Sequence, residues 1–310
     1  MGERIGIVWN PIKVDEDELR DAVTAVFPAD FEVLWWATTR EDPGRIVAGE
    51  AVTGGCDVLI AVGGDGTVRV VAEAVAGTDT ALGIVPRGTG NLLARNLGIP
   101  LGDLTAALER IRDREEEQRL DLGWVALGDE ADAVEQAFTV MIGFGLDAQM
   151  LAETDEELKA KAGWLAYVQA LGRAAAATEL VDTAIALDDE EPEEVRVHTM
   201  LIGNCGTIQA GITLLPDAVP DDGRLDVLLV SAEGFAGWVD TARSVLWDNG
   251  LRRLISGAED AVSTDSATHA SAERIRVVLR EPQPFEIDGE EAGEASSFTV
   301  RVQPGAVRVR

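Results

Sequence analysis

The chain has 310 residues, enough for one large domain or two domains of ordinary size. Its 56 acidic residues outnumber the 26 basic ones, so the formal net charge is −30 at pH 7. This excess argues against nucleic acid as a partner, because contacts with the phosphate backbone rely on Lys and Arg, and it also opposes broad adhesion to an anionic membrane.

The first third of the chain alternates between strand-like and helix-like patterns. Residues 5–9 and 31–37 predict strands, whereas residues 15–27, which begin with acidic side chains, and residues 43–52, which begin with proline, predict helices. Alternation of this kind predicts a parallel sheet with helices on both faces and right-handed crossovers.

A glycine-rich turn follows the next buried strand, which is predicted at residues 57–62. Residues 63–67 read Gly-Gly-Asp-Gly-Thr, and a helix is predicted to begin near Val68. The glycines leave backbone N–H groups uncovered at a helix N-terminus, where an anionic phosphate is favoured. Asp65 would repel a bare phosphate unless a divalent cation or a bound hydroxyl lies between them. The turn therefore favours metal-dependent phosphoryl transfer, although similar turns also serve only to reverse the chain.

A second polar turn lies at residues 86–91, which read Pro-Arg-Gly-Thr-Gly-Asn. It follows a predicted strand at 81–85 and precedes Leu92, Leu93 and Leu97 at helical spacing. Parallel strands of one sheet place successive turns of this kind at their carboxyl ends, where open α/β sheets bind ligands. We therefore expect the two glycine-rich turns to face one crevice.

The pattern changes near residue 119, where short apolar runs such as 194–198 and 224–230 predict half-buried antiparallel strands. We expect a first domain at residues 1–118, a charged linker at 110–119 and a β-rich domain at 119–299. Residues 188–194 are interpreted as a solvated hairpin tip, and residues 256–272 as a loop. Helices are predicted at 156–173 and 235–247. The first is rich in lysine, and we expect it either to pack on the core or to form a membrane or lid contact.

Several other sites are excluded. No lysine stands in a Walker A motif, and neither His198 nor His269 begins a protein-kinase catalytic loop. Residues 143–148 fit a dinucleotide-binding fingerprint only superficially, because they lie in the β-rich half without a βαβ unit. The acidic, lysine-poor composition suits either a GC-rich genome or a salt-adapted cytosol, and the sequence leaves both open.

The compartment follows from the cysteines and the apolar runs. Cys56 and Cys205 form no metal-spaced cluster or disulfide framework, so buried thiols in a reducing compartment are expected. No apolar run approaches the roughly 18 to 20 residues that span a bilayer, and the N-terminus lacks the layout of a signal peptide. We expect a cytoplasmic protein that associates transiently with a membrane.

The order of the motifs resembles the diacylglycerol kinase catalytic-domain family, particularly its soluble bacterial lipid kinases. The likeness runs over nearly the whole chain. Besides the two turns it rests on Asn-Pro at 10–11, Leu-Asp-Leu-Gly at 120–123, Asp-Gly-Arg-Leu-Asp at 222–226 and Asp-Gly-Glu at 288–290. The resemblance implies an α/β N-terminal domain with a parallel sheet, of the NAD kinase/diacylglycerol kinase-like type, and a β-rich antiparallel sandwich. It also implies a last strand, at about 300–310, that returns to the first domain.

The resemblance further implies a lipid kinase that uses ATP and Mg²⁺, acts in phospholipid biosynthesis and has diacylglycerol as the nominal acceptor. Glu290 would accept the proton of the acceptor hydroxyl; without the resemblance it would be interpreted as an exposed hairpin glutamate. Asp65 and Asp121 would hold the catalytic Mg²⁺ directly or through water. The expected nucleotide contacts, with Thr38 competing for the place of Thr39, are Asn10, Thr39, Gly63, Gly64, Asp65, Gly66, Thr67, Gly88 and Thr89.

A structural Mg²⁺ site is also implied, formed by Asp222 with the carbonyls of Val219 and Arg224; an Asp-Gly hairpin turn is the alternative. Where the family usually has a glycine triplet after an Asn-Gly pair, residues 203–211 read differently, so the acceptor is left open. A soluble kinase of the NAD kinase type and a non-enzymatic nucleotide-binding regulator remain as alternative functions. The oligomeric state, a homodimer included, is open.

Overall fold

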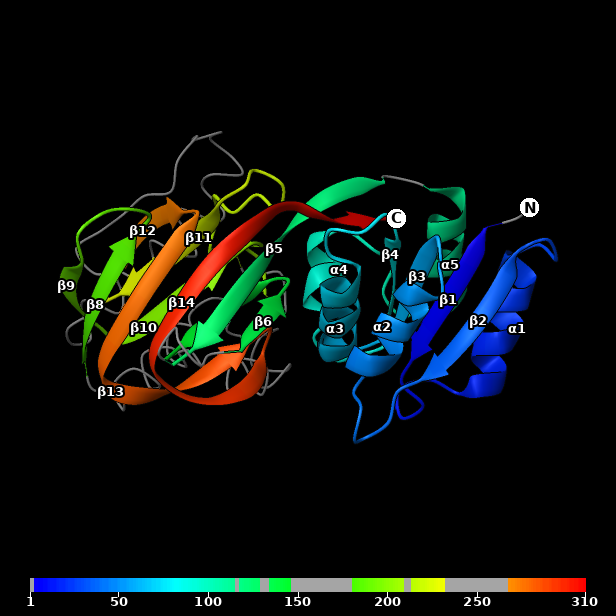
Figure 1. Cartoon of the computed structure of the whole chain (residues 1–310), viewed down its shortest axis with the longest axis horizontal. Coiled ribbons are helices and arrows are strands. Elements are labelled where there is room, and N and C mark those ends of the chain that lie inside the picture. Colours follow the sequence, from blue (N-terminus) through cyan, green and yellow to red (C-terminus); the bar gives the residue numbers. More distant parts are fainter. Residues whose placement is uncertain (1–2, 115–116, 129–133, 146–179, 209–212, 232–266) are drawn as a thin grey trace, which may run out of the picture.

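The computed structural model describes residues 3–114, 117–128, 134–145, 180–208, 213–231 and 267–310. These residues form an α/β region that contains the N-terminus and a β-rich region beside it (Figure 1). Two long strands, β5 (Gln118–Leu127) and β14 (Glu290–Val309), pair with each other and run from one region toward the other (Figure 1). The helices predicted at 156–173 and 235–247 lie outside the described residues.

The α/β region contains the predicted parallel sheet. Its strands lie in the order β4-β3-β1-β2 and all pair in parallel, with bounds β1 (Arg4–Trp9), β2 (Glu32–Ala37), β3 (Val58–Gly63) and β4 (Ala81–Pro86). The helices are α1 (Glu16–Val26), α2 (Arg45–Thr53), α3 (Asp65–Val75), α4 (Leu92–Asn96) and α5 (Leu104–Asp113). Helix α1 packs with α5 and α2 with α3, as expected for helices that cover two faces of one sheet.

Two expectations for this region are corrected. Helix α3 begins at Asp65 rather than near Val68, because Gly64 is already its N-cap; the second half of the first glycine-rich turn is therefore the first turn of a helix. Residues 110–113, expected in a linker, belong to α5. Arg112 and Asp113 lie on the polar side of an amphipathic helix, whereas Arg110 is buried together with the apolar side, which includes Leu104, Leu108 and Ile111.

The β-rich region is antiparallel throughout its described pairings, as predicted. Besides β5 and β14 its strands are β6 (Glu135–Phe138), β7 (Met141–Phe144), β8 (Val181–Leu187), β9 (Glu193–Val197), β10 (Thr199–Gly203), β11 (Leu225–Val230), β12 (Ala267–Ala272) and β13 (Arg274–Ile287). Phe285 and Phe298 pack against each other in its core with their rings tilted and the ring centroids 4.8 Å apart. Residues 267–272 were expected in a loop but pair with β11 along their length, so this prediction was wrong there. Three of these six residues are alanines, which have low strand propensity, and pairing with β11 overrides it.

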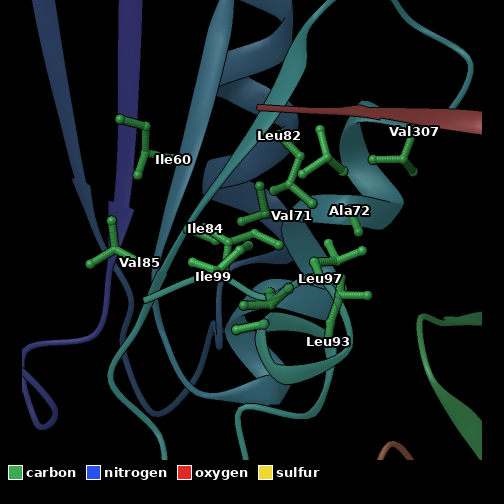
Figure 2. Packing of buried hydrophobic residues seen from close by; sticks show 14 of the residues in the cluster. Ile60, Val71, Ala72, Leu82, Ile84, Val85, Leu93, Leu97, Ile99 and Val307 are labelled. Carbon is green, nitrogen blue, oxygen red and sulfur yellow. The ribbon is translucent and has the colours of Figure 1, made fainter. Parts of the chain in front are cut away.

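The end of β14 returns to the first region, as predicted. Val309 pairs in parallel with Leu82 of β4, and Val307 belongs to the same buried cluster as Leu82 and Ala72 (Figure 2). The hairpin of β13 and β14 therefore belongs to a chain segment anchored in both regions. The domain boundary at residue 118 stays a prediction. Within the described ranges, no helix has the length and apolar character needed to cross a bilayer.

Candidate active site

The two glycine-rich turns contact each other at the carboxyl edge of the parallel sheet. The N–H of Arg87 donates to the carbonyl of Gly63 at 2.7 Å. A Cβ atom on Gly88 would lie 2.6 Å from the Cα of Gly64, and a Cβ on Gly64 would lie 3.3 Å from the Cα of Gly88. The backbones can approach this closely only because both residues lack a side chain. The structure thus brings the turns together, as the sequence predicts.

Asp65, in the first turn, is hydrogen-bonded to the end of the second turn. Its carboxylate accepts hydrogen bonds from the N–H groups of Asn91 at 2.8 Å and Leu92 at 2.5 Å, which are at the start of α4. Asn91, with φ 48°, in turn exchanges two side-chain hydrogen bonds with the backbone of Gly88. Burial raises the pKa of Asp65 to about 6; the hydrogen bond from Leu92 opposes this shift and the charge of Asp288 adds to it.

Glu290 reaches the first turn from the other end of the chain. A Cβ atom placed on Gly66 would lie 2.5 Å from Glu290 Oε1 and 3.0 Å from Oε2, so the carboxylate lies directly against this glycine. Arg69, one turn further along α3, donates from Nη2 to Oε2 at 2.7 Å. The side chain of Glu290 is 53% exposed, so it remains open to a substrate.

Asp288 holds the hairpin that carries Glu290. Its buried carboxylate accepts hydrogen bonds from the N–H groups of Thr139, Val140 and Met141 and from the Thr139 hydroxyl, all at 2.8–3.1 Å. Burial raises the pKa of Asp288, although the hydrogen bonds from this loop and the charge of Arg69 oppose the shift. From the sequence, Asp288 is only part of the Asp-Gly-Glu motif, and this role was not predicted; its place before Gly-Glu was the available signal.

Asp121 is hydrogen-bonded to loops in a different part of the molecule. Its two carboxylate oxygens accept the N–H groups of Gly305 and Gly223, each at 2.6 Å, and its own N–H donates to the carbonyl of Pro220 at 2.7 Å. These bonds tie β5 to a register shift in β14 and to the loop before β11. Asp65 and Asp121 therefore organise separate loops, and their ligation of Mg²⁺ stays a prediction.

The other predicted nucleotide contacts lie in loops that follow the parallel strands. The N–H of Asn10, directly after β1, donates to the carbonyl of Val62 at 3.0 Å, which places Asn10 beside the first turn. The hydroxyl of Thr39 accepts an N–H within its own loop at 3.0 Å, whereas Thr38 is buried and Thr89 is exposed. Their contacts with a nucleotide stay predictions.

The predicted structural metal loop forms a tight turn. Asp222 accepts the N–H of Arg224 at 2.9 Å, and its own N–H donates to the carbonyl of Val219 at 3.4 Å. Burial, together with the charges of Asp222 and Asp217, raises the pKa of Asp226 to about 7. Carboxylates are thus concentrated here, which suits a cation. Across the described ranges, however, no group of three or more His, Cys, Asp or Glu side chains is arranged to hold a metal.

The chain is similar to known proteins over nearly its whole length. Residues 9–125 match the diacylglycerol kinase catalytic domain, and residues 140–310 match the YegS C-terminal NAD kinase beta sandwich-like domain. The chain belongs to the YegS-like, diacylglycerol kinase-like family. YegS-like relatives include two proteins named probable lipid kinases. The one from Pseudomonas aeruginosa is 30% identical over 310 residues, covering 99% of this chain and 94% of the relative. The one from Xanthomonas euvesicatoria is 29% identical over 319 residues, covering 98% and 94%.

Solved structures show the same fold. A putative diacylglycerol kinase from Bacillus anthracis aligns with a TM-score of 0.70 at 22% sequence identity, over 99% of this YegS-like chain and 96% of that chain. Another crystal structure of a diacylglycerol kinase from the same organism aligns with a TM-score of 0.66 at 19% identity, over the same shares of the two chains. The expected fold class, a parallel α/β region with a β-rich sandwich-like region, is confirmed.

Proposed function

We propose that this protein is an ATP- and Mg²⁺-dependent lipid kinase that phosphorylates a hydroxyl group of diacylglycerol or a related lipid. The observation that carries the proposal is the contact between the carboxylate of Glu290 and Gly66 in the first glycine-rich turn. A phosphoryl-transfer site needs positioned phosphates and a group that receives the proton of the acceptor. Here a solvent-exposed carboxylate lies against the N-terminus of the helix that would receive the phosphates.

The roles follow from the chemistry of the transfer. The backbone N–H groups in the first turn of α3 bind the terminal phosphates of ATP, because the first N–H groups of a helix have no partner within it. Glu290 accepts the proton of the lipid hydroxyl as its oxygen attacks the γ-phosphorus. A bond forms between that oxygen and phosphorus, the bond from phosphorus to the β–γ bridging oxygen breaks, and ADP leaves with the electron pair.

The residues present fit a divalent cation. The carboxylates of Asp65, Asp288 and Glu290 gather around the first turn, and Arg69 is the basic side chain that interacts with two of them. Each oxygen of Asp65 accepts one N–H and keeps a second lone pair, so Asp65 can hold a hydrated Mg²⁺ through water. Bound Mg²⁺ would neutralise charge that develops on the phosphates. We propose a second Mg²⁺ at Asp222, supported by the carboxylates concentrated there.

The lipid acceptor is proposed from the family and from the names of the relatives. A lipid substrate requires peripheral contact with a membrane, and we propose that this contact is transient because the chain is strongly acidic. The protein would act in the cytoplasm.

The test is to incubate the purified full chain with labelled ATP, Mg²⁺ and a total lipid extract in detergent micelles, and to identify the labelled product. The proposal expects label in a phospholipid, which should disappear when the lipid is omitted. Label in NADP⁺ when NAD⁺ replaces the lipid would instead support a soluble kinase of the NAD kinase type. ATP binding without transfer to either acceptor would indicate a non-enzymatic regulator.

A further inference from the structure

Arg69 and Gly66 are three residues apart on α3, so they lie on the same face of the helix. Glu290 contacts both: its carboxylate packs against Gly66, and its Oε2 accepts a hydrogen bond from Arg69 Nη2 at 2.7 Å. The contact joins residues 221 positions apart in the sequence. Helix α3 therefore contributes a cation as well as the glycine-rich turn to this site.

The two partners differ in how firmly their surroundings hold them. The side chain of Arg69 is 16% exposed and that of Glu290 is 53% exposed. Arg69 Nε is buried without a hydrogen-bond partner, and the charge of Arg69 acts on the buried Asp288 as well. Arg69 is thus the more enclosed side chain, facing the carboxylates of the hairpin, whereas Glu290 has room to adopt other rotamers.

We propose that Arg69 is a positioning residue that holds the carboxylate of Glu290 against Gly66. This inference rests on the proposed function. An exposed glutamate loses side-chain freedom when it is fixed in one rotamer, and a charge-assisted hydrogen bond from an enclosed guanidinium offsets that loss. Gly66 provides the space for the carboxylate and Arg69 fixes it there, so the base is oriented before the acceptor arrives. Arg69 would act through Glu290 rather than by binding ATP.

The test compares kcat and KM for ATP in the lipid phosphorylation assay for the full chain. A misplaced base costs about 10²-fold per ångström, so Arg69→Met should lower kcat about 10- to 100-fold while KM for ATP changes less than about threefold. Arg69→Lys keeps the charge on a different head group and should recover part of kcat. Arg280→Met is the matched control, because Arg280 pairs with Asp182 on the exposed face of β13 and should keep wild-type kinetics. Melting temperatures check that each variant folds.

A double variant of Arg69 and Glu290 tells a positioning role of Arg69 from a general structural one. If Arg69 acts only through Glu290, Arg69→Met should cause no further loss in a Glu290→Gln background. Loss by the same factor in both backgrounds, or a raised KM for ATP with unchanged kcat, would overturn the inference. Unchanged kinetics of Arg69→Met, with the rate of Glu290→Gln lowered by about 10²-fold or more, would overturn the inference alone. If the wild-type chain transfers phosphate to no lipid, the proposed function fails and this inference fails with it.

Discussion

Replacing Gly66 with alanine probes the contact between the first glycine-rich turn and Glu290. The added Cβ would lie 2.5 Å from Glu290 Oε1, about 1 Å inside the roughly 3.5 Å at which non-bonded atoms pack best. The atom it meets is the end of an exposed, flexible side chain, so the carboxylate moves aside by about 1 Å. Gly66 does not have a positive φ, and alanine is favoured over glycine within a helix by roughly 0.5–1 kcal/mol. The fold should therefore be at least as stable.

The expected result is a loss of about 10²-fold in kcat, since displacing a reacting group by 1 Å costs about that much, without a lower free energy of unfolding. The assay is lipid phosphorylation, with urea unfolding on the same samples. Gly49→Ala is the matched control, because Gly49 is an exposed residue of α2 whose added Cβ would meet nothing within 4 Å. Wild-type kcat in Gly66→Ala, or an equal loss in Gly49→Ala, would show that displacement of the Glu290 carboxylate does not control the rate.

The remaining predictions concern the second turn, Asp65 and the proposed metal loop. Gly88→Ala should lower the free energy of unfolding by about 1–3 kcal/mol, because its Cβ would lie 2.6 Å from the Cα of Gly64, and wild-type stability in urea would contradict this. Because the pKa of Asp65 is raised from 3.8 to about 6, the folded state binds more protons in this range, so stability without divalent cations should fall as pH rises from about 4 to 6. In Asp65→Asn the free energy of unfolding should fall by on the order of 3 kcal/mol less over this pH range than in the wild type. Parallel curves of stability against pH for the two proteins would show that Asp65 does not titrate in this way. Mg²⁺ should raise the melting temperature of the wild type more than that of Asp222→Ala, which keeps only the proposed site at Asp65, and equal shifts would exclude Asp222 as a ligand.

The first region could be predicted from the sequence almost element by element. Strands β1, β3 and β4 are buried apolar runs, and β2 is an apolar run that is only partly buried. The helices carry caps or turn residues at their ends, as with Asp15, which caps α1. Helix α5 was missed because its charged side was interpreted as a linker. Strand β12 was missed because half of its residues are alanine, which has low strand propensity, so the strand depends on pairing with β11.

Part of the candidate site could likewise be predicted from the sequence, and part could not. Local patterns identified both glycine-rich turns, because phosphate-binding backbone has a recognisable composition. The late Asp-Gly-Glu motif was identified only through the resemblance to the kinase family. The sequence could not show that Asp65 accepts from the start of α4, or that Arg69 pairs with Glu290, since partners far apart in the chain are set by the tertiary fold. Arg69 had one available signal: it is the basic residue of α3, one turn after Gly66.

In the proposed mechanism, Glu290 receives the acceptor proton beside the first glycine-rich turn. The most direct measurement is the rate of phosphoryl transfer to lipid by Glu290→Gln, with the affinity for ATP determined on the same preparation. We expect a rate lower by about 10²- to 10⁴-fold with unchanged ATP affinity and an intact fold. A rate near that of the wild type would contradict it.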